Sequence, residues 1–219
     1  MQPNGDFQIH DVPPGTYQFR GDISDGPANS FFGGGKVLGH LNEQITVPEP
    51  PTGQPNAPLD LGPITVQMVK NLKTGDPAPD FEVKTIDGGM LRLADFRGKY
   101  VLLDFWATWC GPCRAETPEL KAAYDSYSKN PKFAMIGLSL DKTVEAPRDY
   151  AKKEGMTWPQ GFLGDWSEAK LTARYGVEGI PAIFLLDPAG NIFATGLRGA
   201  DISAVVGAAL RGPKTLDHQ

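Results

Sequence analysis

Apolar and polar positions follow two different patterns along this chain. In the first third, short alternating runs such as Thr16–Phe19 and Ile64–Val69 are separated by prolines and glycines, which predicts strands and loops. From Asp76 onward, nearly continuous apolar runs alternate with segments of helical character, which favours an α/β layer architecture. We therefore expect a small all-β segment with a proline-rich linker at residues 1–75 and an α/β domain at residues 76–219.

The expected α/β domain opens with a hairpin, in which the runs Phe81–Ile86 and Met90–Leu93 flank the turn sequence Asp87–Gly89. The run Tyr100–Trp106 is apolar at nearly every position, as expected of a strand buried on both faces. The other expected elements, in chain order, are a helix at Cys110–Ser128 that Pro118 kinks, a strand at Phe133–Leu140, a helix at Val144–Glu154, a helix from the N-cap Ser167 to Gly176, strands at Ala182–Leu186 and Ile192–Thr195, and a helix at Ile202–Leu210.

Composition narrows the range of partners. A net charge of −5 argues against nucleic acid and against anionic membranes as partners. No run of about 18 apolar residues occurs, so we expect no membrane-spanning segment in the chain. The first residues, Met1–Asp6, lack the basic and apolar regions of a secretory signal.

The chain has two cysteines, Cys110 and Cys113, separated by Gly111 and Pro112. A disulfide across so short a loop would stabilise the fold by about 2 kcal/mol at most in the chain-entropy account, so a purely structural role is disfavoured. A zinc site is also disfavoured, because zinc takes about four ligands and the three histidines lie far from the cysteines in sequence.

Cys110 follows the predicted buried strand and opens the predicted helix. The unpaired N–H groups and the positive end of the helix dipole favour its thiolate, so we expect its pKa to fall from about 8.5 toward neutral. Cys113 is expected on the same side of the helix, one turn deeper, where it can attack a mixed disulfide formed at Cys110. The pair therefore predicts thiol–disulfide exchange.

Residues Asp76–Arg211 resemble the TlpA/ResA-like branch of thioredoxin-fold proteins, with Trp109–Cys113 as the most specific motif. The hairpin and an extra strand-to-helix insertion between Leu140 and Ser167 are typical of this branch. The resemblance implies a thioredoxin fold, with a central mixed sheet flanked by helices, and a monomeric enzyme of the periplasm or cell envelope. It implies reduction of protein disulfides, in apocytochrome c or envelope proteins, with electrons from an upstream thiol reductant. It implies no metal and no cofactor besides the redox-active Cys110–Cys113 disulfide.

The same resemblance assigns roles to further residues. Asp104 matches a buried acid that accepts the proton of Cys113, although Phe133–Leu140 lacks the lysine that thioredoxins usually place beside this acid. Pro181 matches the cis-proline opposite the cysteines, which would turn the Ile180 backbone toward an extended substrate. The remaining residues expected to bind substrate are Trp109, Gly111 and Pro112.

The run Phe7–Phe19 resembles part of the carboxypeptidase-regulatory-like or transthyretin-like β-sandwich modules. In those modules this motif lies well inside the domain, so we expect the chain to be a fragment and its remaining strands to have exposed edges. A proline-rich linker with transient strands is the alternative interpretation.

Two other functions stay open. Peroxiredoxins share the hairpin and the insertion, but the cysteine that reacts with peroxide follows a proline-containing motif that Leu103–Trp109 lacks. A binding or tethering protein would use the β segment for recognition and the α/β domain as a scaffold. The complete set of expected site residues argues against this alternative. Trp106 is expected in the core, and Arg114 and Glu116 are expected on a solvated helix face.

Overall fold

The computed structural model describes residues 9–24, 37–49, 60, 62, 64, 67–68, 72–167 and 169–212. Contacts divide the chain into two units, residues 1–69 and residues 70–219. Gly75 belongs to the larger unit, in which its N–H donates to the Ile192 carbonyl at 2.8 Å. The first two residues of the run Phe7–Phe19 lie outside the described residues, and Ile9 is not in a strand.

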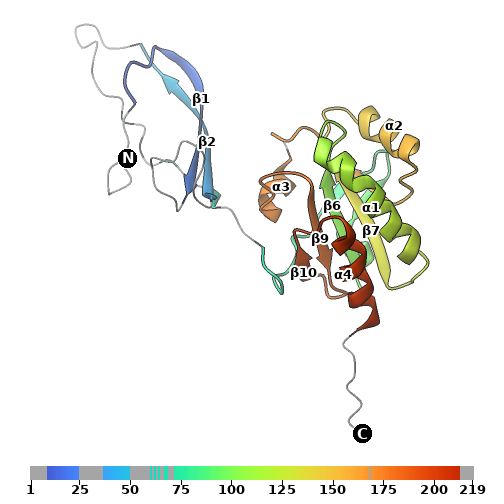
Figure 1. Cartoon of the computed structure of the whole chain (residues 1–219). Helices are drawn as coiled ribbons and strands as arrows, with labels where there is room; N and C mark the ends of the chain where they lie inside the picture. Colours follow the sequence, from blue (N-terminus) through green and yellow to red (C-terminus); the bar gives the residue numbers. More distant parts are fainter. Residues whose placement is uncertain are drawn as a thin grey trace. The chain divides into compact units, whose positions relative to one another are not determined.

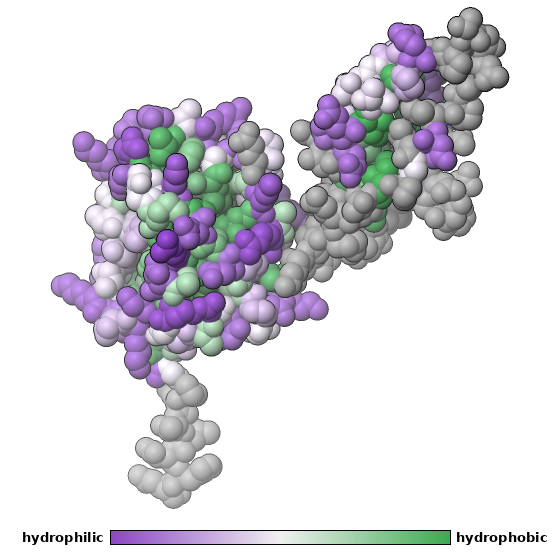
Figure 2. All heavy atoms as spheres, turned by 180° about the vertical axis from the view of Figure 1, so that it is seen from behind, coloured by the Kyte–Doolittle hydropathy of each residue, from purple (hydrophilic) through white to green (hydrophobic). Residues whose placement is uncertain are grey.

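The smaller unit contains a long antiparallel strand pair. Strand β1 (Gly15–Ser24) pairs with β2 (Val37–Val47), and β2 also pairs with the short β3 (Gln67–Met68), in the order β1-β2-β3. The hydroxyl of Tyr17 donates to the Pro13 carbonyl at 2.8 Å and joins the preceding segment to β1. Figure 2 shows apolar residues at the surface of this unit, flanked by polar ones. Its assignment to a carboxypeptidase-regulatory-like module stays a prediction.

A five-stranded mixed sheet forms the centre of the larger unit. Its strands are β6 (Tyr100–Trp106), β7 (Phe133–Ser139), β8 (Gln160–Phe162), β9 (Ala182–Leu186) and β10 (Ile192–Thr195). Their order is β10-β9-β6-β7-β8, with β6 parallel to β7 and antiparallel to β9. Leu102, Leu103 and Phe105 in the central strand are fully buried, as the apolar run predicts. The predicted thioredoxin fold with a central mixed sheet is confirmed.

Helices pack on this sheet. They are α1 (Gly111–Tyr127), α2 (Glu145–Glu154), α3 (Lys170–Tyr175) and α4 (Ala200–Arg211), with a 3-10 helix η1 at Leu93–Phe96. In Figure 1, α1 and α4 lie side by side over the sheet, on the side turned to the reader. Helix α1 continues through Pro118. Helices α2 and α3 end at Gly155 and Gly176, whose φ angles of 66° and 64° are ones that glycine adopts most readily.

The start of α3 differs from the prediction. Ser167 was expected to be its N-cap, but the N-cap is Ala169 and the helix begins at Lys170. The backbone N–H and the hydroxyl of Ser167 instead donate to the Asp165 carboxylate at 3.0 and 2.7 Å. Short polar side chains form such local turns as readily as they cap helices, so the prediction was wrong for this residue.

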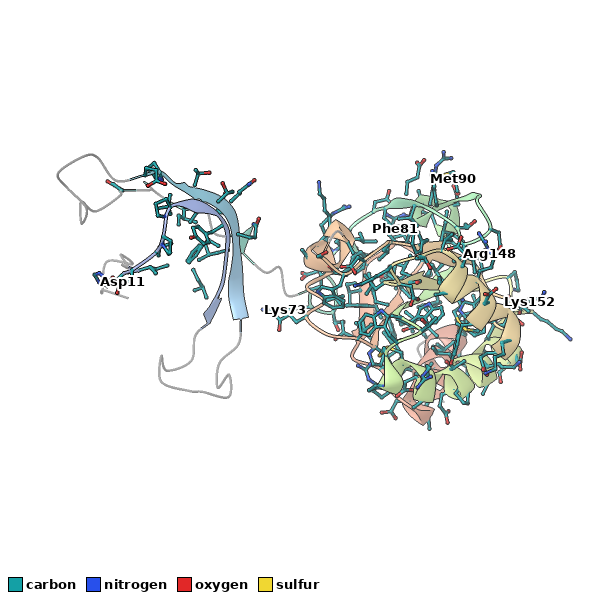
Figure 3. The ribbon with its side chains drawn as sticks, turned by 90° about the horizontal axis from the view of Figure 1, so that it is seen from above. Asp11, Lys73, Phe81, Met90, Arg148 and Lys152 are labelled. Carbon is teal, nitrogen blue, oxygen red and sulfur yellow. A yellow bond between two sulfur atoms is a disulfide. The ribbon has the colours of Figure 1, made fainter. Side chains whose placement is uncertain are left out.

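The predicted hairpin is present as β4 (Glu82–Lys84) and β5 (Met90–Arg92), and it packs against the insertion that follows β7. The Ile86 N–H donates to the first carbonyl of β8 at 3.0 Å. Arg148 of α2 donates from Nε to the Ile86 carbonyl at 2.8 Å. In Figure 3, Phe81 beside the hairpin and Arg148 lie on the same side of the unit. The hairpin and the insertion, far apart in sequence, therefore support each other at the β8 edge of the sheet.

One close contact in the core depends on a glycine. Gly137 of β7 lies beside Gln160, whose Oε1 accepts the indole N–H of Trp106 at 3.0 Å. A Cβ atom at position 137 would come within 2.1 Å of that oxygen. Gln160 and Trp106 are 3% and 2% exposed, so the contact lies in the core, where Trp106 was expected.

Replacing Gly137 with alanine should destabilise the larger unit by about 1–3 kcal/mol, because the added methyl group would force Gln160 away from Trp106. Urea denaturation of Gly137→Ala and the wild type measures this difference. Gly179→Ala is the matched control, because a Cβ atom there meets nothing within 4 Å. A Gly137→Ala protein as stable as the Gly179→Ala protein would contradict the expected clash.

Candidate active site

The two cysteines lie between β6 and α1. Cys110 is the N-cap of α1, and Gly111 and Pro112 begin the helix. A disulfide joins Cys110 to Cys113, whose Cα atoms are 5.2 Å apart. The Cys113 N–H donates to the Cys110 sulfur at 3.1 Å. This sulfur therefore takes the place of the oxygen that usually caps a helix, facing the unpaired N–H groups of the first turn.

A buried carboxylate fixes the loop that leads to Cys110. Asp141 is 2% exposed and accepts hydrogen bonds from the Thr108 backbone N–H at 3.2 Å and from the Thr108 hydroxyl at 2.5 Å. The Ser139 hydroxyl donates to the same carboxylate at 2.8 Å. The end of β7 therefore holds the loop just before the cysteines. Asp141 was not among the predicted site residues, although an acidic residue directly after a buried apolar run is a signal that could identify it.

The cis-proline loop lies against the first cysteine. The Ile180–Pro181 peptide bond is cis, Pro181 is buried, and Ile180 is half-buried. The Ile180 carbonyl oxygen lies 3.6 Å from the Cys110 sulfur. In the disulfide, the Cys110 sulfur carries no proton, so the two atoms are in contact without a hydrogen bond. In the reduced protein, a Cys110 thiol could donate a hydrogen bond to this carbonyl. The structure thus brings together two predicted site segments that are about 70 residues apart in the chain.

The residues around the disulfide are more exposed to solvent than the two cysteines. Trp109 is 59% exposed, and Gly111 and Pro112 are exposed as well, whereas Cys110 and Cys113 are 5% and 3% exposed. A Cβ atom at position 111 would meet nothing within 4 Å, so the space in front of the helix start is open. An exposed indole beside a nearly buried disulfide is a suitable apolar contact for another protein.

Asp104 lies in the middle of β6, between Gly137 of β7 and Ile183 of β9. It is 2% exposed, and its Oδ1 has no hydrogen-bond partner within the protein. Burial away from water raises the pKa of the Asp104 carboxyl to about 7, and the negative charge of Glu116 adds to the effect, while the positive charge of Arg198 opposes it. The carboxyl can therefore gain or lose a proton near neutral pH.

Two charged residues near Asp104 were missed as site residues. Glu116 was expected on a solvated helix face, but it is half-buried, and its Oε2 accepts the Gly199 N–H at 2.8 Å. Arg198 donates to the Pro181 carbonyl. Neither residue belongs to a motif in the sequence, and only the packing of α1 against the loop before α4 reveals them. Arg114 is exposed, as predicted.

The described part of the chain contains neither a metal-binding cluster nor a helix that could span a membrane. Among these residues no group of three or more His, Cys, Asp or Glu side chains is arranged to hold a metal ion. None of the helices described is both long and apolar enough to cross a bilayer.

The AhpC/TSA family model matches residues 74–195, which include the hairpin, the cysteine pair and the cis-proline loop. The chain belongs to the AhpC/TSA family. This family member is 33% identical to the thiol-disulfide oxidoreductase ResA of Bacillus anthracis over 123 residues, which are 56% of this chain and 69% of the relative. It is 36% identical to the thioredoxin-like protein YneN of Bacillus subtilis over 124 residues, 55% of this chain and 69% of the relative.

Solved structures similar to this AhpC/TSA family member have the same fold. The thioredoxin domain of a thiol-disulfide oxidoreductase from Bacteroides vulgatus is 36% identical with a TM-score of 0.59, covering 63% of this chain and 97% of that one. A thiol:disulfide interchange protein from Bacteroides sp. is 35% identical with a TM-score of 0.60, covering 67% of this chain and 96% of that one. Together with the Cys110–Cys113 disulfide, these similarities make the chain a thiol–disulfide oxidoreductase of the TlpA/ResA-like type.

The raised pKa of Asp104 predicts how the stability of this AhpC/TSA family member depends on pH. The folded-state value of about 7 exceeds the unfolded value of about 3.9, so the folded protein holds a proton that the unfolded chain releases between these pH values. Stability contributed by the neutral carboxyl is therefore lost as pH rises from about 4 to about 7. Asp104→Asn should raise the free energy of unfolding of the oxidised protein at pH 8, by up to about 4 kcal/mol, and should have little effect near pH 4.

Urea denaturation of the oxidised protein at both pH values checks this prediction. Asp125→Asn, an exposed change on α1, is the control for loss of one negative charge. A stabilisation by Asp104→Asn that is the same at pH 4 and pH 8 would show that ionisation of Asp104 is not its cause.

Proposed function

We propose that this chain reduces disulfide bonds in other proteins, with Cys110 as the nucleophile and Cys113 as the resolving cysteine. The observation that carries the proposal is the position of the Cys110 sulfur, which caps α1, accepts the Cys113 N–H at 3.1 Å and lies 3.6 Å from the Ile180 carbonyl oxygen. A sulfur at a helix N-terminus is favoured as the thiolate, which is the form that attacks disulfides.

In the first step, the Cys110 thiolate of the reduced protein attacks one sulfur of the substrate disulfide. A bond forms between Cys110 and that sulfur, the substrate disulfide breaks, and the second substrate sulfur leaves as a thiolate that takes up a proton. The product is a mixed disulfide. The low exposure of Cys110 means that a substrate must present its disulfide directly over the helix start.

In the second step, Cys113 attacks the Cys110 sulfur. Asp104 accepts the Cys113 proton, directly or through water, because its pKa of about 7 lets it act as a base at neutral pH. The Cys110–Cys113 disulfide forms, the bond between Cys110 and the attacked substrate sulfur breaks, and that sulfur leaves as a thiolate that takes up a proton. Two electrons have passed from the cysteine pair to the substrate, and an upstream thiol reductant must return them before the next cycle.

The substrate would lie along the cis-proline loop. The Ile180 backbone lies beside the reacting sulfur, where its N–H and C=O groups can pair with an extended segment of the substrate. Trp109, Gly111 and Pro112 offer exposed contacts around the same sulfur. Backbone pairing recognises an extended chain with little regard to its sequence, so this surface suits several protein substrates rather than one.

The residues between the cysteines favour reduction over oxidation. Gly111 and Pro112 add no positive charge that would further stabilise the Cys110 thiolate. A strongly stabilised thiolate makes an oxidant, with a potential of about −120 mV, whereas thioredoxin lies near about −270 mV. We expect a reduction potential close to the second value, measured by equilibration with glutathione or dithiothreitol.

Cys110→Ser should abolish insulin reduction, whereas Cys113→Ser should accumulate a mixed disulfide with the substrate, because the first step proceeds and the second does not. The chain has only these two cysteines, so mass spectrometry after alkylation of free thiols reports on this pair alone. Equal insulin reduction by Cys110→Ser and the wild type would remove the reductase proposal. Peroxide turnover by Cys113→Ser with an external thiol would favour the peroxiredoxin-like alternative instead.

We further propose that the protein acts in the periplasm or cell envelope, as its resemblance to the TlpA/ResA-like branch implies, with envelope proteins or apocytochrome c as substrates. Cys113→Ser expressed in the source cells should trap these substrates as mixed disulfides in the envelope fraction. Recovery of the protein and its trapped partners from the cytoplasm alone would contradict this location. A monomeric state stays a prediction.

A further inference from the structure

Arg198 lies in the loop between β10 and α4, beside the cis-proline. Its Nη2 donates to the Pro181 carbonyl, and its Nη1 donates to the Leu197 carbonyl at 2.6 Å. The next residue, Gly199, donates its N–H to Glu116 Oε2 at 2.8 Å. The loop is therefore joined both to the cis-proline segment and to the helix that carries the cysteines.

The charges that act on Asp104 belong to two residues that make these contacts, Arg198 and Glu116. On the two flanking strands, Asp104 lies opposite the uncharged residues Gly137 and Ile183. Cys110 and Cys113 form a disulfide and do not titrate. The groups whose charges reach the carboxyl are Arg198 and Glu116, which are opposite in sign. Arg198 is an exposed residue, and none of the ion pairs found among the described residues joins it to Asp104, so its charge acts through space.

We propose that Arg198 is a positioning residue that keeps a positive charge near the Asp104 carboxyl while holding the Pro181 carbonyl, so that one side chain connects the proton acceptor to the substrate-binding loop. This inference rests on the proposed function, because it assigns Arg198 to the step in which Cys113 loses its proton. The two backbone carbonyls hold the guanidinium in place, which fixes the position of its charge.

The consequence is a larger fraction of ionised Asp104 at neutral pH. Without the positive charge, the pKa of Asp104 rises above its value of about 7. If the rise is about 1, the ionised fraction at pH 7 falls from about one half to about one tenth, and resolution by Cys113 slows about fivefold. Glu116 has the opposite effect, so loss of its charge should lower the pKa of Asp104.

The test compares Arg198→Gln, Arg198→Lys and Glu116→Gln in the full chain. The carboxyl carbon of Asp104 is titrated by NMR in the oxidised protein, with Asp104→Asn used to assign its signal. We expect the pKa of Asp104 to rise in Arg198→Gln, to fall in Glu116→Gln, and to stay closer to the wild-type value in Arg198→Lys, which keeps the charge. Because Arg198 is exposed, we also expect the effect of Arg198→Gln to shrink at about 1 M salt.

A shift in the same direction for Arg198→Gln and Glu116→Gln would overturn the proposal, because general loosening of the site would explain both. A titration of Arg198→Lys that coincides with that of Arg198→Gln would also overturn it, since the charge would then have no role. Arg174→Gln, an exposed change on α3, is the control for loss of one positive charge and should leave the titration unchanged.

A second readout links the titration to the reaction. The rate at which Cys113 resolves a preformed mixed disulfide should fall about fivefold at pH 7 in Arg198→Gln and recover at higher pH, as more Asp104 ionises. A loss of rate that is the same at every pH would contradict a role through Asp104. The NMR titration reports on Asp104 in the oxidised protein whether or not the chain reduces substrates, so failure of this inference and failure of the reductase proposal are separable.

Discussion

The site depends on a carboxyl group that the fold keeps away from water. Asp104 lies in the central strand of the sheet, with apolar neighbours on both sides and one oxygen without a partner. Ionising such a group is costly, so its pKa rises to about 7 and the folded protein is less stable at neutral pH than it would be with a neutral residue there. A stability cost at a buried acid is typical of a functional site, because nothing in the packing of the sheet requires an acid at this position.

The sheet and its connections bring the other groups to this carboxyl. Strand β6 carries Asp104 and leads directly into the cysteine loop, so a single segment sets the distance between the acid and the disulfide. Strand β9 is antiparallel to β6, and Ala182 at its start pairs with Phe105. The cis-proline Pro181, which precedes Ala182, therefore lies at the end of β6 that leads to the cysteines. Asp141 then fixes the same loop from the end of β7. Three adjacent strands thus each contribute to the site. Because β7 is parallel and β9 antiparallel to β6, the end of β7 and the start of β9 lie at the same edge of the sheet as the cysteines.

The parts of the site that the sequence predicts correctly are those encoded locally. The apolar run of β6, the cysteine motif after it and the turn of the hairpin each occupy a few consecutive residues. Strand β8 was not predicted, because Gln160–Phe162 is too short to give a pattern, and β2 was not predicted, because polar residues such as Asn42–Gln44 interrupt its alternation. Glu116 and Arg198 were missed for another reason. Their effect depends on contacts with segments far away in the chain, and no property of their neighbours in sequence reveals it.

The charges around the disulfide follow the movement of the proton in the proposed cycle. Before resolution, Asp104 carries a negative charge that the charge of the half-buried Glu116 opposes, whereas the positive charge of Arg198 favours it. When Cys113 loses its proton, Asp104 becomes neutral, and the new negative charge lies on a sulfur that is consumed at once in forming the disulfide. The charge then leaves with the substrate thiolate. A base whose pKa lies near the working pH suits this order of steps. A carboxyl with a much lower pKa would not take the proton, and one with a much higher pKa would already hold it. Burial is the main cause of the raised pKa of Asp104, and Arg198 and Glu116 adjust that pKa in opposite directions.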